Sequence, residues 1–240
     1  MNFSGKWKQV QKYAELIQSP LERDFSKASK VLLLDATFSK IKGRDIAIHI
    51  AYDTGIGVID YWLDETENKT AYSYILRRLE EKKYVPICVV SDRHWSLLPA
   101  IKERKLPHQY CLFHLLQELR RALTRSHTAK PAGKNAILYS RIKWILKTKN
   151  IEQLPEKIEF FRKKTMPLFK DKQSILKWFW TILPHAILHL SYNEDVANTT
   201  GLLENLNGQI KQRIKTFRGV KSEDSLYKLL KVLFFFRKYK

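Results

Sequence analysis

Two aspartates stand at positions where a charge is costly. Asp35 lies inside the apolar run VLLLDATF (31–38), and an aspartate within such a strand is expensive to bury unless its charge is compensated. Asp92 directly follows the apolar run ICVVS (87–91), and ligands bind at the carboxyl ends of parallel strands in open α/β sheets. Each residue alone could equally be a hydrogen-bonded structural aspartate. If their strands are neighbours, however, the two carboxylates repel each other, and a bound divalent cation is the usual remedy.

The elements that would place these aspartates follow from changes in the hydrophobic pattern. Residues 1–30 predict a short helical lead-in, and the apolar runs at 31–38, 45–53 and 58–63 predict three strands. The residues Thr54-Gly55-Ile56-Gly57 supply turn chemistry between the second and third strands. Because the connections are short, we expect the three strands to form an antiparallel meander.

Helices and strands alternate in the next part of the chain. A helical stripe ends near Lys83, and the strand at 87–91 is followed by a helix at about 96–105. A short strand at 108–112 then leads into a long amphipathic helix. The order β-β-β-α-β-α-β-α predicts an α/β fold with a ribonuclease-H-like mixed sheet. The first and fourth strands are adjacent in that layout.

From about Thr124 to Leu190 the hydrophobic spacing is helical throughout, which predicts an all-helical insertion. It follows the second aspartate and precedes a helix that carries Glu204. The expected organisation is therefore a lead-in (1–30), the first part of the core (31–123), an all-α insertion (124–197) and C-terminal core helices (198–240).

The charge of the chain indicates a polyanionic partner. Its 44 Lys and Arg residues against 24 Asp and Glu residues give a formal net charge of +20, which favours nucleic acid. Between Arg120 and Lys149 there are nine basic residues and no acid, a pattern better explained by phosphate contact than by a solvated charge run. A second acid-free basic stretch follows Glu204 and contains Lys211, Arg213, Lys215, Arg218 and Lys221.

Four blocks of sequence, in this order, resemble the catalytic region of Mutator-type insertion-sequence transposases, within the DDE transposases. They are LLLDATF around Asp35, VVSDRHWSLLPAI around Asp92, YCLFHLLQEL with Cys111 and His114, and NTTGLLENLNGQIKQRIKTFRGVKS around Glu204. The blocks extend from about residue 30 to residue 225. Glu204 alone would be an ordinary helical glutamate, but the resemblance implies that it completes a catalytic triad with Asp35 and Asp92.

The resemblance also implies a reaction and its cofactors. Two Mg²⁺ ions about 3.5–4 Å apart clamp the attacking and leaving oxygens of a phosphodiester, and Mn²⁺ should substitute for Mg²⁺. We expect Asp35 to bridge both ions, with Asp92 and Glu204 each holding one. The family nicks the element end by hydrolysis, and the liberated 3′-hydroxyl attacks target DNA. The expected partners are therefore double-stranded DNA, from both transposon ends and target, and further copies of the chain on that DNA.

Cys111 and His114 have metal-ligand spacing, but a closed zinc site needs four ligands. The one other thiol, Cys88, is expected to be buried in the fourth strand. A structural or DNA-contacting role is therefore expected for Cys111 and His114, with Arg120 and Arg121 contacting phosphates nearby.

Two alternatives to an active transposase core remain open. Only 34 residues precede Asp35, so end recognition would reside in a separate domain or protein, and the chain could be a non-catalytic DNA-binding remnant. A ribonuclease-H-like nuclease would share the same site. No apolar run approaches the roughly 20 residues that span a bilayer, and the two cysteines exclude a disulfide framework. We expect a cytoplasmic, nucleoid-associated protein without a membrane partner.

Overall fold

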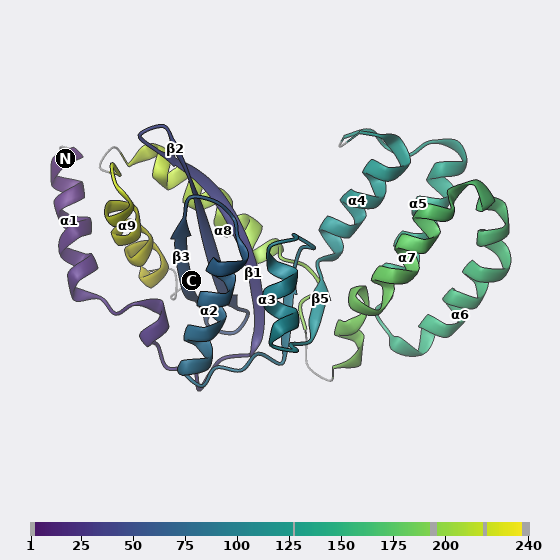
Figure 1. The fold of residues 1–240 in the computed structure, drawn as a ribbon, viewed down its shortest axis with the longest axis horizontal. Coiled ribbons are helices and arrows are strands. Elements are labelled where there is room, and N and C mark those ends of the chain that lie inside the picture. The colour runs from purple at the N-terminus through teal and green to yellow at the C-terminus, as the bar shows by residue number, and fades with distance from the viewer. Residues whose placement is uncertain (1–2, 127, 193–195, 218–219, 237–240) are drawn as a thin grey trace. The chain divides into compact units, whose positions relative to one another are not determined.

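The computed structural model describes residues 3–126, 128–192, 196–217 and 220–236 (Figure 1). The chain divides into two compact units. The first consists of residues 1–107 and 200–240 and is called the sheet unit below. The second consists of residues 108–199 and is called the helical unit.

Five strands form one mixed sheet in the order β3-β2-β1-β4-β5. They are β1 (Val31–Ile41), β2 (Arg44–Asp53), β3 (Gly57–Asp64), β4 (Cys88–Ser91) and β5 (His108–Tyr110). β1 pairs antiparallel with β2 and parallel with β4, and β2 pairs antiparallel with β3. The predicted meander and the predicted neighbourhood of the first and fourth strands are confirmed. The strand order is that of the expected ribonuclease-H-like sheet.

β1 extends to Ile41, three residues beyond the apolar run at 31–38 from which the strand was predicted. Its pairing with β2 continues to Ile41 opposite Arg44. The two residues of the connecting turn, Lys42 and Gly43, have φ values of 49° and 86°. Positive φ at both central positions suits the two-residue turns whose twist matches that of the flanking strands. The hairpin therefore closes tightly.

The helices described in the sheet unit are α1 (Phe3–Leu16), α2 (Lys69–Glu81), α3 (Leu97–Glu103), α8 (Gly201–Thr216) and α9 (Glu223–Phe236). Neighbouring residues of β3 show that helices cover both faces of the sheet, since successive side chains of a strand point to opposite faces. The Trp62 ring packs against Tyr74 of α2, with centroids 4.4 Å apart. The Tyr61 ring packs against Tyr227 and Phe234 of α9, at 4.8 and 5.1 Å. Figure 1 shows α1 alongside α9.

The final helix, α9, begins directly after Ser222. Ser222 Oγ accepts a hydrogen bond from the backbone N–H of Ser225 at 3.2 Å. Glu223 and Asp224 occupy the first turn, where acidic side chains interact favourably with the helix dipole. Ser222 therefore caps α9.

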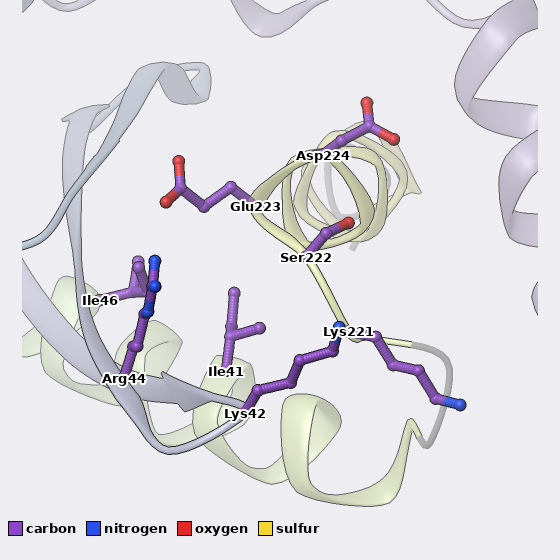
Figure 2. A pocket seen from close by; sticks show the side chains of 8 residues that line it. All are labelled: Ile41, Lys42, Arg44, Ile46, Lys221, Ser222, Glu223 and Asp224. Carbon is purple, nitrogen blue, oxygen red and sulfur yellow. The ribbon is translucent and has the colours of Figure 1, made fainter.

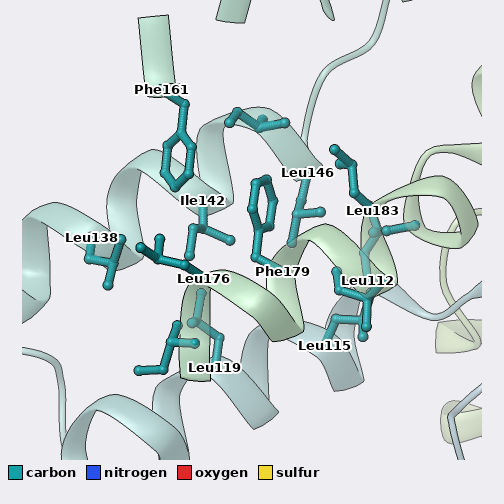
Figure 3. Close-up of a cluster of buried hydrophobic side chains, with 14 of the residues drawn as sticks. Leu112, Leu115, Leu119, Leu138, Ile142, Leu146, Phe161, Leu176, Phe179 and Leu183 are labelled. Atoms are coloured by element: carbon teal, nitrogen blue, oxygen red, sulfur yellow. The ribbon is translucent and has the colours of Figure 1, made fainter. Parts of the chain in front are cut away.

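The helical unit begins with β5 and continues with α4 (Leu112–Thr124), α5 (Gly133–Leu146), α6 (Leu154–Phe160) and α7 (Gln173–Ala186), joined in part by short 3₁₀ and π turns. Its core is formed by apolar stripes of α4, α5 and α7 together with Phe161 and Phe169 (Figure 3). In Figure 3, Leu115 and Leu119 of α4 lie in the same cluster as Phe179 of α7.

The place of α4 differs from the organisation expected from the sequence, in which residues 31–123 belonged to the first part of the core. α4 lies in the helical unit because its buried leucines share the core of α5 and α7. The sequence shows that α4 has an apolar face, but not what that face packs against. The four predicted domain boundaries themselves remain predictions.

Candidate active site

Asp35 and Asp92 occupy matching positions at two adjacent parallel strands. The strand register pairs Leu33 of β1 with Val90 of β4. The same offset, carried two residues further, aligns Asp35 with Asp92, which is the first residue after β4. Neighbouring strands lie about 4.8 Å apart, and side chains two residues apart point to the same face. The two carboxyl groups therefore leave the sheet at the same level.

α8 meets β1 at Asp35. The side-chain amide of Asn207 donates a hydrogen bond to Asp35 Oδ2 at 2.8 Å, and the backbone N–H of Ala36 donates to Asp35 Oδ1 at 2.9 Å. Glu204 lies three residues before Asn207 and therefore on the same side of α8. It is in the first turn of that helix, where the helix dipole favours an acid. Thr200 Oγ1 donates to Glu204 Oε1 at 3.3 Å.

The three predicted carboxylates are thus all in the sheet unit, although they do not form a closed cluster. Among the residues that the structure describes, their oxygens do not all lie within 4.8 Å of one another. Carboxylate oxygens are the ligands that hard divalent cations prefer. The chemistry of Asp35, Asp92 and Glu204 therefore fits Mg²⁺ or Mn²⁺, held by α8, the middle of β1 and the residue after β4.

The buried Tyr72 lies near several acidic residues, and their charges affect its pKa. Burial raises the pKa of Tyr72 in α2 well above its ordinary value, and the negative charges of Glu67, Asp35 and Asp92 raise it further. The Tyr72 hydroxyl donates to Glu67 Oε1 at 2.7 Å. Burial also raises the pKa of Glu67, an effect that its hydrogen bond from Tyr72 opposes and the charge of Asp92 reinforces.

His94 stabilises the loop that carries Asp92 through contacts of its backbone and its ring. The backbone N–H of His94 donates to Asp92 Oδ1 at 3.0 Å. Its ring Nδ1 lies 3.0 Å from Glu67 Oε1 and 2.7 Å from Ser96 Oγ. Tyr72, Glu67 and His94 therefore form a chain of contacts that ends at Asp92. Sequence reasoning missed Glu67 and Asn207, because no spacing pattern links either residue to the aspartates.

A second aspartate of the same sheet, Asp53 at the end of β2, has different surroundings. It is fully buried, and each of its carboxylate oxygens accepts several hydrogen bonds. The donors are the backbone N–H groups of Ser29, Lys30, Gly55 and Ile56 and the hydroxyl of Tyr84, at distances from 2.8 to 3.1 Å. A carboxylate so enclosed by donors stabilises the fold and cannot take a metal ion without losing them.

The basic residues that follow Glu204 lie on different sides of α8. At 3.6 residues per turn, Lys211 and Lys215 fall in line with Glu204, whereas Arg213 falls on the opposite side of the helix. All three side chains are exposed. Arg218, the fourth predicted DNA-binding residue of this stretch, lies outside the described residues. The alignment favours Lys211 and Lys215 over Arg213 as groups that reach a substrate near Glu204.

The other predicted DNA-binding residues belong to the helical unit. Cys111 is buried just before the first turn of α4, and His114 lies in that turn with its ring against Phe113, at a centroid distance of 5.5 Å. Arg120 is half-buried and Arg121 is exposed near the other end of α4. Cys88, as expected, is buried in β4. The roles of the α4 residues remain predictions.

A hollow of about 660 Å³ in the sheet unit lies away from the carboxylates. It is lined by the β1–β2 hairpin and the start of α9 (Figure 2). Lys42, Arg44 and Lys221 contribute positive charge, and Glu223 and Asp224 contribute negative charge. Because the charges are mixed and the two acids already occupy the α9 N-terminus, this hollow does not resemble a phosphate site.

A ribonuclease-H-like sheet with paired aspartates and a glutamate on a helix packed against them is typical of nucleic-acid-processing enzymes. The family model described as "Transposase, Mutator family" matches residues 8–239. The chain therefore belongs to the Mutator family of transposases. A curated relative, the "Transposase for insertion sequence element IS905" of Lactococcus lactis subsp. lactis (strain IL1403), is 25% identical over 232 residues. The match covers 89% of this chain but 55% of the relative, so the chain spans about half of that protein.

Among solved structures, similarity is found to catalytic core domains of retroviral integrases. The HTLV-2 integrase core in complex with magnesium (trimeric form) is 14% identical with a TM-score of 0.30, and the match covers 50% of this chain and 86% of that one. The BIV integrase core is 11% identical with a TM-score of 0.28, covering 77% and 99%. At such scores the fold assignment rests on the strand order. No helix in the described part of the chain is long and apolar enough to cross a membrane.

Proposed function

We propose that this chain is the catalytic core of a DNA transposase that cleaves and joins phosphodiester bonds with divalent metal ions. The observation that carries the proposal is the register of β1 and β4, which aligns Asp35 with Asp92, together with α8, which meets β1 at Asp35 and carries Glu204 one turn away. This arrangement supports a shared metal site for three carboxylates that come from distant parts of the chain.

In the proposed reaction, water attacks a phosphorus atom at the element end and the bond to the 3′-oxygen breaks, leaving a 3′-hydroxyl and a 5′-phosphate. That hydroxyl then attacks a target phosphodiester and displaces another 3′-oxygen. Bound Mg²⁺ supplies activation of the nucleophile and stabilisation of the leaving oxyanion. Asp35, Asp92 and Glu204 would hold the metal. His94 and Glu67 keep Asp92 in place.

The proposal is tested with DNA that carries the terminal repeats flanking the coding sequence, in the presence of Mg²⁺ or Mn²⁺. Asp35→Asn is expected to lower the cleavage rate by more than about a hundredfold. Losing a residue that only hydrogen-bonds a metal ligand typically lowers activity by about 10- to 100-fold, and losing the ligand itself should cost more. Asp45→Asn is the matched control, since Asp45 is an exposed acid of the same sheet that pairs with Lys40 at 3.5 Å. Equal cleavage by the Asp35 variant and the wild type would refute the assignment.

The same assay separates the two alternatives. Strong DNA binding without nicking in any divalent ion would favour the non-catalytic DNA-binding remnant. Preferred cleavage of RNA–DNA hybrids at fixed salt would favour the ribonuclease-H-like nuclease. Assembly of several copies on the DNA remains a prediction.

We further propose that Lys211 and Lys215 contact DNA phosphates beside the cut site. Binding should weaken steeply as salt rises, because released counterions drive it. Lys215→Gln should lower the slope of log affinity against log salt by about one. Arg213→Gln, two residues away on the opposite side of α8, should change it less. An equal effect of the two variants in a fluorescence anisotropy titration would contradict the proposed orientation of α8 toward DNA.

A further inference from the structure

Asn207 of α8 carries a polar atom that the fold leaves unsatisfied. Its side chain is only 8% exposed. The amide nitrogen donates to Asp35 Oδ2 at 2.8 Å, but the amide oxygen, Oδ1, accepts no hydrogen bond from any residue in the described part of the chain. A buried acceptor without a donor is uncommon and costly, and it calls for a specific explanation.

The orientation of this amide is fixed by chemistry. An ionised carboxylate only accepts hydrogen bonds, so the atom of Asn207 that faces Asp35 has to be the NH₂ group. Turning the amide over would place two acceptor oxygens against each other. Asn207 Oδ1 is therefore the amide atom that does not face Asp35 Oδ2.

The neighbouring charges select the kind of ligand that Oδ1 can receive. Two of its neighbours are acids, Glu204 three residues earlier on α8 and Asp35 on β1. The basic residue on this side of the helix, Lys211, lies one turn further on and is exposed. A phosphate oxygen would be repelled by the acids and would offer Oδ1 no proton. A divalent cation, or a water molecule polarised by one, would be attracted by both acids and would satisfy Oδ1 directly.

We propose that Asn207 is a positioning residue of the metal site. Its NH₂ group donates a hydrogen bond to the Asp35 carboxylate. Its Oδ1 coordinates a divalent cation or accepts a hydrogen bond from a water molecule of that cation's hydration shell. This inference rests on the proposed function, because it concerns the same metal site. It adds a fourth residue, one turn of α8 beyond Glu204, which the carboxylate pattern does not contain.

The inference is tested by titrating the whole chain with Mn²⁺ and measuring free Mn²⁺ by electron paramagnetic resonance, without DNA. Asn207→Ala should weaken Mn²⁺ binding by about 10- to 100-fold, as is typical when an outer partner of a metal site is lost. The matched control is Asn205→Ala in the same helix, where the Asn205 side chain is exposed and bonds only Gln209 among the described contacts. It should leave the affinity within about twofold.

A second variant separates a metal-directed role from a purely structural one. Asn207→Asp removes the donor to Asp35 and adds a negative charge beside it, so the metal-free protein should melt at a lower temperature. The added carboxylate still offers oxygens to a cation, so Mn²⁺ should raise the melting temperature of this variant more than that of the wild type. If Asn207 only supports the fold, Mn²⁺ has no reason to stabilise the variant more than the wild type. A smaller Mn²⁺-induced rise in melting temperature than in the wild type would therefore overturn the inference.

The variant Asp35→Asn distinguishes failure of this inference from failure of the proposed function. If Asp35→Asn loses Mn²⁺ binding while Asn207→Ala binds as tightly as the wild type, the role of Asn207 is wrong and the metal site stands. If both variants bind Mn²⁺ like the wild type, the proposed metal site itself is wrong, and the role of Asn207 falls with it.

Discussion

Asp53 and Asp35 lie on paired strands of one sheet, yet their surroundings differ in kind. In the register of β1 and β2, Asp53 is opposite Leu32, three positions along β1 from Asp35. Asp53 is enclosed by backbone N–H groups and the Tyr84 hydroxyl. Asp35 has Asp92 aligned with it on the next strand, and the helix that carries Glu204 packs against it.

Whether a buried acid serves the fold or the chemistry depends on the groups that surround its carboxylate. Donors that converge on a carboxylate stabilise its charge within the fold and leave no need for a ligand. Acids that converge on one another raise the energy of the metal-free state, which a cation can relieve. The Asp53 end of the sheet should therefore govern stability, whereas the Asp35 end should govern activity.

The largest expected effect on stability follows from Asp53→Ala. The substitution leaves buried N–H groups and the Tyr84 hydroxyl without their acceptor, so the free energy of unfolding should fall by about 3 kcal/mol or more. Urea denaturation of the metal-free protein measures the change. Asp35→Asn should remain within about 1 kcal/mol of the wild type or gain stability, because active-site charges are often held at a cost to the fold. Equal losses for the two variants would remove the distinction between the two aspartates.

A smaller effect is expected at Gly55, whose backbone N–H donates to Asp53 Oδ1 at 2.8 Å. A Cβ atom there would lie 3.0 Å from the backbone nitrogen of Ser29 and 3.1 Å from the backbone oxygen of Lys27. Because backbone atoms cannot move aside cheaply, Gly55→Ala should lower the free energy of unfolding by about 1–3 kcal/mol.

Gly208 in α8 provides the matched control for Gly55. Nothing lies within 4 Å of a Cβ built at this position, and alanine is the better helix former. Gly208→Ala should therefore raise the free energy of unfolding by about 0.5–1 kcal/mol. A loss at Gly208 similar to that at Gly55 in the same urea titration would mean that the turn at Asp53 is not specially constrained.

Much of the sheet could be predicted from the sequence because its signals are local. The apolar runs around Asp35 and before Asp92 identify buried strands, and the short connections predict the meander that the structure shows. The alignment of Asp35 with Asp92 then follows from the neighbourhood of β1 and β4. The turn residues Thr54 to Gly57 were also identified, although the enclosure of Asp53 by that turn was not.

The remaining parts of the site depend on tertiary contacts that leave no local pattern. Asn207 is one of several polar residues in α8, and only the packing of that helix on β1 brings its amide to Asp35. Glu67 precedes α2 and contacts His94 across the fold. The orientation of Arg213, in contrast, could have been found by counting helical turns from Glu204. The catalytic and DNA-binding roles of the predicted residues remain predictions.

In the proposed function, Asp35, Asp92 and Glu204 meet around divalent cations. Anomalous X-ray scattering from crystals of the chain soaked in Mn²⁺ would locate these cations and their ligands. We expect two Mn²⁺ peaks, with Asp35 bound to both and Asp92 and Glu204 each bound to one. Mn²⁺ bound elsewhere, with the Glu204 carboxylate away from every peak, would contradict it.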